Sequence, residues 1–142
     1  LARGWSYCPG QPVAYASMTT AGLTSLIISR SELVRRKSYS GSFSRKCEKA
    51  IHDGLAWHQH HYDVNTNPGR LHWVHHYYLY GLERVGMLAR MEQFGERPWY
   101  DDGARFLCTT QERSGRWFNT RDTCFALLFL KRATTPVAIS GE

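Results

Sequence analysis

The sequence predicts an all-α chain built of helical hairpins. Apolar residues recur at helical spacing in five segments, and glycine, proline, asparagine and serine gather in the connections between them. Segments with a single apolar stripe alternate with segments that are apolar on nearly every side. A helix that is apolar all round is buried all round, so the alternation predicts an inner and an outer layer of helices.

The first, third and fifth expected helices are the apolar ones and form the inner layer, and the second and fourth form the outer layer. The polar, basic stretch 31–42 reads as a long surface connection, and "FGERPW" reads as a turn. Each hairpin repeats after roughly 45 to 55 residues, a period typical of helical-hairpin arrays. The expected helices cover residues 17–30, 42–61, 71–91, 99–112 and 121–132.

The bulk properties favour a single globular unit over residues 1–142. A hydrophobic content of 42% can supply a core, and the opening "LARGWSYCPG" has neither an initiator Met nor a leader pattern, which suggests a fragment of a larger repeat domain or a processed chain. The run "CFALLFL" is too short to cross a membrane. Four cysteines without CxxC spacing predict buried thiols and slightly favour the cytoplasm.

The net charge of +6 is concentrated between Arg30 and Lys49, where seven basic residues face only Glu32 and Glu48. Such a run can bind nucleic acid, but a solvated surface or a connector is the more common outcome. Nucleic-acid binding is therefore kept as an alternative and is not the favoured function.

A motif lies between the fourth and fifth expected helices. "FLCTTQERSGRW" presents an aromatic and an aliphatic residue, then Gln111, Gly115 and Trp117 at fixed spacing. This motif resembles the QW motif of the terpenoid cyclase and protein prenyltransferase superfamily, which includes squalene-hopene cyclase. The opening "RGWSY" is similar to the tail of a previous copy, with Trp5 in the place of Trp117, and "MTTAGLTSL" then stands where "RDTCFALLF" stands.

The resemblance implies a partial α/α toroid in which Gln111, Gly115 and Trp117 link neighbouring hairpins and have no catalytic role. A closed toroid needs more hairpins than this chain contains. We therefore expect the flanks of the third and fifth helices to meet either missing repeats or a second subunit, and we expect a homo-oligomer.

The proposed topology brings the N-termini of the inner helices to one end of the layer. Such ends attract anions, and in the resembling families the inner funnel holds the substrate. Tyr80 and Glu83 lie further along the third helix, where Glu83 and Arg84 need partners or a wet cavity. The candidate pocket residues are Thr19, Thr20, His72, His75, His76, Tyr80, Glu83, Arg121, Asp122 and Cys124.

The catalytic signatures of the resembling enzymes are incomplete. The DxDD acid motif of the cyclases is missing, since the only paired acids are Asp101 and Asp102 on an outer helix. The zinc site of the prenyltransferases uses an Asp, a Cys two residues later and a distant His. Asp122 and Cys124 fit the first two, and His72 or His76, four apart and expected on one helix face, would have to supply the third.

Asp122 is equally a helix N-cap and Cys124 equally a small core residue. The sequence therefore favours the absence of a cofactor, and a zinc ion is the alternative. The favoured function is a toroid module, non-catalytic or incomplete, whose inner face binds a small ligand or a partner. The alternative is a metal-dependent transferase or a carbohydrate-active enzyme that uses Asp122, Cys124, His72 and His76.

Overall fold

The computed structural model describes residues 1–134 and is mainly helical, which confirms the all-α prediction. Within these residues, five α-helices are joined by loops and by one two-stranded hairpin. Residues 36–40 link the first two helices, and the longer loop 61–74 links the second to the third. The elements are α1 (Ala16–Arg35), α2 (Gly41–His60), α3 (His75–Leu88), β1 (Gln93–Phe94), β2 (Arg97–Pro98), α4 (Trp99–Thr110) and α5 (Thr120–Leu130).

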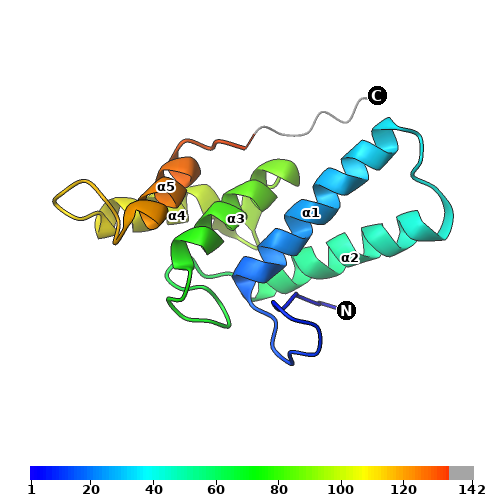
Figure 1. Ribbon diagram of the computed structural model, residues 1–142, viewed down its shortest axis with the longest axis horizontal. Helices are drawn as coiled ribbons and strands as arrows, with labels where there is room; N and C mark the ends of the chain where they lie inside the picture. Colours follow the sequence, from blue (N-terminus) through cyan, green and yellow to red (C-terminus); the bar gives the residue numbers. More distant parts are fainter. Residues whose placement is uncertain (135–142) are drawn as a thin grey trace.

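The helices α1, α3 and α5 lie side by side and run in the same direction, with α3 in the middle (Figure 1). α2 packs against α1, while α4 packs against α3 and α5. The alternate helices therefore form a layer of three, which we call the α1/α3/α5 layer, with α2 and α4 behind it.

The first connection was predicted wrongly, because α1 continues through Arg35. Its last turns are stabilised by Glu32, which accepts hydrogen bonds from Arg35 and Arg36 at helical spacing. These ion pairs stabilise helical structure in residues 31–35, which the sequence had assigned to a polar connection. β1 and β2 likewise form a small hairpin at the predicted turn.

The third helix was also bounded wrongly, because α3 begins at His75 and not near Leu71. Leu71 and Val74 adopt left-handed backbone angles, with φ of 52° and 48°, which end any helix before it can reach His75 from upstream. His72 therefore lies in the turn before α3, and the prediction that His72 and His76 share one helix face is wrong.

The core is centred on α3, which has no exposed residue along its length. Its side chains Tyr78, Leu79 and Leu82 meet Leu23 of α1 and Phe129 of α5 in one buried cluster. The prediction of burial on nearly all sides is confirmed for this helix, because α1 and α5 cover both of its flanks.

The fifth helix departs from the prediction. Only Asp122, Ala126 and Phe129 of α5 are buried, while Leu127 and Leu128 are 55% and 36% exposed. In the described part of the chain, α5 has a neighbour only on the side of α3 and α4, so its outer flank meets no other helix.

The prediction of buried thiols holds for one cysteine only. Cys47 is buried in α2, whereas Cys8, Cys108 and Cys124 are exposed, and all four are free. The apolar neighbours of Cys108 and Cys124 in sequence point to other sides of their helices. Apolar neighbours in sequence therefore did not predict whether these two thiols are buried.

The two tryptophans that the sequence pairs, Trp5 and Trp117, make the same contact. The backbone N–H of Trp5 donates to Thr19 Oγ1 and that of Trp117 donates to Thr123 Oγ1, both at 3.0 Å. Each threonine is the fourth residue of its helix, α1 or α5. The expected alignment of the two helix starts is therefore off by one residue, since it placed Thr19 opposite Asp122.

Residues 111–119 connect α4 to α5 and include a tight turn. Gln111 follows the last residue of α4, and its Nε2 donates to the Gly115 carbonyl at 2.7 Å. Gly115 has a φ of 84°, a left-handed angle that glycine adopts without strain. Trp117 is buried and its Nε1 donates to the Leu107 carbonyl at 2.9 Å, which attaches the start of α5 to α4.

Candidate ligand-binding face

A cleft of about 420 Å³ opens where the N-termini of α3 and α5 meet. It gathers five of the residues that the sequence proposed for a pocket: His72 from the turn before α3, His75 and His76 of α3, and Arg121 and Asp122 of α5. Trp73 and Phe118 flank it and are 58% and 77% exposed. The cleft is lined by His72, Trp73, Val74, His75, His76, Phe118, Arg121 and Asp122.

Unusual backbone angles shape the rim of this cleft. Val74 and Phe118 both have positive φ, at 48° and 39°, and a β-branched residue such as Val74 adopts this conformation only under strain. Asn67 holds the loop before α3: its amide Nδ2 donates to the Trp73 carbonyl at 2.9 Å, and its Oδ1 accepts from the Ser17 backbone N–H at 2.9 Å. Strain of this kind is common at binding sites.

The two histidines of the cleft that lie on α3 differ in their roles. His75 is buried, and its Nε2 lies 2.8 Å from the Val64 carbonyl. Burial lowers the pKa of His75 to about 4, against the opposing effect of that hydrogen bond. His75 is therefore neutral at pH 7 and donates Nε2–H to Val64, which gives it a structural role.

His76 points toward the charged part of the cleft. Its Nδ1 lies 3.8 Å from Asp122 Oδ1, and Arg121 Nε lies 3.6 Å from the same oxygen. Burial lowers the pKa of His76 more than Asp122 raises it, so the imidazole is neutral at pH 7 and the contact is not an ion pair. Its buried Nε2 has no hydrogen-bond partner among the described residues.

The predicted zinc ligands are not gathered into one site. Cys124 is exposed on α5, and His72 is exposed in the turn before α3. Within residues 1–134 there is no group of three or more His, Cys, Asp or Glu side chains that could hold a metal ion. Only His76 and Asp122 of the predicted set come near each other.

A row of side chains continues from the cleft along α3. His76, Tyr80, Arg84 and Leu88 follow at intervals of four, so they lie on one face of the helix, and we call them the α3 stripe. Every member lines a cavity on the α1/α3/α5 layer. The spacing of the α3 stripe can be found in the sequence, but only once the start of α3 at His75 is known.

Two hollows lie beside the α3 stripe and share Tyr80 and Arg84. The smaller one, of about 190 Å³, lies between α1 and α3 and includes Thr24. The larger one, of about 410 Å³, is bounded by Ile28 of α1 and Leu128 of α5. Together with the cleft they follow α3 along its whole length.

The middle of the stripe combines aromatic rings with a positive charge. Phe125 of α5 stacks on Tyr80 with centroids 5.4 Å apart, and it also meets Tyr77 at 5.5 Å. Arg84 Nη1 donates to the Tyr80 hydroxyl at 3.0 Å. An apolar surface with one cation suits a ligand with an apolar body and a negative end.

Unpaired polar atoms also gather on this face. Three buried side-chain polar atoms in residues 1–134 lack a hydrogen-bond partner, and two of them, Thr24 Oγ1 and His76 Nε2, belong to residues that line its cavities. Buried polar atoms are nearly always paired, so each such atom calls for an explanation. A bound ligand or water would supply it.

Other predicted pocket residues are used inside the fold. Thr19 accepts the Trp5 N–H, and the buried Thr20 donates to the Ser17 carbonyl. Glu83 is fully buried and accepts hydrogen bonds from Thr134, just past α5, and not from a neighbouring helix. The sequence reasoning missed Thr24, Leu88 and Phe118, since nothing in their immediate surroundings marks them as cavity residues.

The acidic pair Asp101 and Asp102 lies away from the α3 stripe, on α4. Asp102 forms an ion pair with Arg97 and accepts a hydrogen bond from the Tyr62 hydroxyl.

None of the helices in the described part of the chain has the length and apolar character to cross a membrane. Comparison of the chain with protein-family models, with curated proteins and with solved structures gave no match.

Proposed function

We propose that this chain is a segment of an α/α toroid, non-catalytic or incomplete, whose exposed α1/α3/α5 face binds an elongated ligand with an apolar body and an anionic end. The α3 stripe carries this proposal, since His76, Tyr80, Arg84 and Leu88 each line a cavity on one helix face. These four residues span about 18 Å of helix.

The chemistry of the face selects the ligand class. Tyr80 and Phe125 offer stacked rings, and Leu128 extends the apolar surface toward α5. Arg84 is the cation beside them and can bind a phosphate or a carboxylate. An isoprenoid chain with a diphosphate end has both parts, and the resemblance of Gln111, Gly115 and Trp117 to the QW motif supports the same class.

The sequence and the site argue for binding without cyclase chemistry. The chain has no DxDD motif, and the acid pair Asp101 and Asp102 belongs to α4, outside the residues that line the cavities of the face. The exposed Leu127 on the outer flank of α5 suits a further repeat or a second subunit, which would extend the same layer.

Calorimetric titration with farnesyl diphosphate and with farnesol tests the proposal. We expect Tyr80→Leu to weaken both ligands and Arg84→Gln to weaken the diphosphate alone, by roughly tenfold for the loss of one charge-assisted contact. Arg105→Gln, which removes an exposed charge from α4, is the matched control. Affinities that are unchanged in both stripe variants, or no binding at all, would rule the proposal out.

A further inference from the structure

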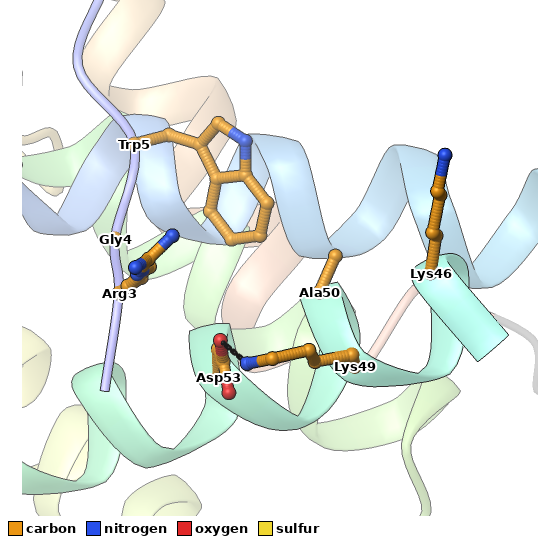
Figure 2. A pocket seen from close by; sticks show the side chains of 7 residues that line it. All are labelled: Arg3, Gly4, Trp5, Lys46, Lys49, Ala50 and Asp53. Carbon is orange, nitrogen blue, oxygen red and sulfur yellow. Dashed lines mark hydrogen bonds and ion pairs between the residues drawn. The ribbon is translucent and has the colours of Figure 1, made fainter. Parts of the chain in front are cut away.

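We propose a second ligand site between the N-terminal segment and α2, which takes a small ligand composed of a flat ring and a phosphate group. The cavity there has a volume of about 320 Å³, and we call it the Arg3 pocket (Figure 2). It shares no residue with the α3 stripe or the cleft. It is lined by Arg3, Gly4, Trp5, Lys46, Lys49, Ala50 and Asp53.

Backbone contacts hold one wall of this pocket in place. The Arg3 N–H donates to the Asp53 carbonyl of α2 at 3.0 Å, and the Trp5 carbonyl accepts from the Tyr15 N–H at 3.1 Å. Gly4 lies so close to the helices that an added Cβ would sit 2.6 Å from Thr19 Oγ1 and 2.7 Å from the Trp57 ring. The wall is therefore fixed before any ligand arrives, which lowers the entropic cost of binding.

The Trp5 indole provides a flat apolar surface in the pocket. Its ring rests against two glycines, where added Cβ atoms would lie 2.8 Å away at Gly22 of α1 and 2.5 Å away at Gly54 of α2. The ring is only partly buried and lines the cavity with its remaining surface. An indole held in this way can stack on a planar ligand ring.

Cations from two separate segments line the pocket together with the indole. Figure 2 shows Arg3 reaching in from the N-terminal segment, while Lys49 and Lys46 come from α2. Lys49 pairs with the buried Asp53, Nζ to Oδ2 at 2.5 Å, whereas Arg3 and Lys46 make no ion pair within residues 1–134. The pocket thus keeps a surplus of positive charge, which a phosphate would neutralise.

Part of the remaining basic stretch is paired locally. Arg30 pairs with Glu48, and Arg35 and Arg36 both pair with Glu32. The positive charge that the sequence concentrates between Arg30 and Lys49 therefore does not form one continuous stripe for a nucleic-acid backbone. In the Arg3 pocket, unpaired cations share a small cavity with an aromatic ring, which favours a small ligand over a polymer.

The test uses adenosine monophosphate as a probe, followed by the indole N–H signals in nuclear magnetic resonance spectra. Trp5→Phe assigns the signal of Trp5, and Trp73 reports on the separate cleft between α3 and α5. We expect the monophosphate to shift the Trp5 signal in a saturable way and to leave Trp73 unmoved. Adenosine and inorganic phosphate, each lacking one half of the ligand, should bind at least about tenfold more weakly.

Two variants and one control decide whether the pocket cations are responsible. Arg3→Gln and Lys46→Gln should each raise the dissociation constant roughly tenfold. Lys37→Gln lowers the net charge equally but lies outside the pocket, so it should change the constant less than about twofold. An unmoved Trp5 signal, equal effects of all three variants, or binding of a single-stranded oligonucleotide without binding of the monophosphate would overturn the proposal.

Discussion

Glu83 in the middle of α3 accepts two hydrogen bonds from Thr134, one from its backbone N–H at 2.9 Å and one from its hydroxyl at 2.7 Å. The carboxylate is fully buried, and the two contacts join positions that lie 51 residues apart in sequence. They hold the chain after α5 beside the larger hollow, whose wall includes Thr134. The buried charge thereby helps to build the proposed ligand face.

Removing this carboxylate should destabilise the fold. We expect Glu83→Ala to lower the free energy of unfolding by about 2 kcal/mol, because both hydrogen bonds are lost and a cavity is left, and Glu83→Gln to cost less because it keeps one acceptor. Urea unfolding followed by circular dichroism measures both. Glu92→Ala removes an exposed carboxylate as a control, and a Glu83→Ala midpoint equal to that of the control would contradict the expectation.

Stability should fall in mild acid because of His58. Burial lowers the pKa of His58 from 6.5 to about 3, so the unfolded chain binds a proton below about pH 6.5 that the folded chain takes up only near pH 3. Stability is therefore full above pH 6.5 and is lost as the pH falls toward 3, by about 1.4 kcal/mol per pH unit. His75, with a pKa lowered to about 4, adds a similar loss over a narrower range.

The variant His58→Phe isolates this effect, because a ring of similar shape stays among Tyr62, Tyr78 and Phe94 without a titrating group. Denaturant unfolding at pH 7 and at pH 5 should show a smaller difference for the variant than for the native chain. An identical pH dependence of the two proteins would show that His58 is not responsible.

The close contact between the Trp5 ring and Gly54 makes Gly54 sensitive to substitution. Alanine is the better helix former by about 1 kcal/mol, yet its Cβ would lie 2.5 Å from the indole. We expect Gly54→Ala to destabilise the protein by about 2 kcal/mol in spite of its helix propensity. In a Trp5→Phe background the smaller ring should remove most of that cost in thermal unfolding, and a cost of equal size in both backgrounds would point to another cause.

The exposed flank of α5 should drive association. Leu127 and Leu128 leave apolar surface in water, so we expect concentration-dependent oligomers in sedimentation velocity experiments. The substitution Leu127→Glu should give a monomer, and Leu128 is kept because it lines the larger hollow. Phe43→Glu, on α2, changes an equally exposed apolar residue and should leave association intact; a native chain that stays monomeric at high concentration contradicts this view.

Metal analysis addresses the rival enzyme hypothesis. Cys124 and His72 are exposed on separate segments, and only His76 approaches Asp122. We therefore expect far less than one zinc per chain when untagged protein is analysed by plasma mass spectrometry. One full equivalent that disappears in Cys124→Ala would revive the transferase alternative.

Helix identity was predictable because it depends on periodic burial, but helix ends depend on contacts that the sequence does not display. The start of α3 at His75 follows from the left-handed Val74 and from Asn67, whose side chain bonds both Trp73 and Ser17. Such long-range ties leave no local pattern. The end of α1 is different, because the spacing of Glu32, Arg35 and Arg36 was already visible as a helix signal.

The candidate site divides in the same way. The topology argument placed the starts of the inner helices at one end, and the structure brings His76 and Asp122 together there. Cys124 and Thr20 were proposed because of their position in the chain alone. Cys124 is exposed on α5 outside the cleft, and Thr20 is buried and donates to the Ser17 carbonyl. Arg3 and Trp5 were not predicted as a site because the rest of their pocket comes from Lys46 to Asp53 of α2, which are distant in sequence.

The shared contact of Trp5 with Thr19 and of Trp117 with Thr123 has an evolutionary consequence. An ancestral gene that encoded one hairpin and was duplicated in tandem would yield equivalent hydrogen bonds at regular positions. In such a series the middle copy would have diverged, since the fourth residue of α3 is Tyr78, whose hydroxyl lies 3.4 Å from His58 Nε2. Evolution would thus have kept the threonine in the first and last copies, as Thr19 and Thr123, and replaced it in the middle copy by Tyr78, which pairs with His58.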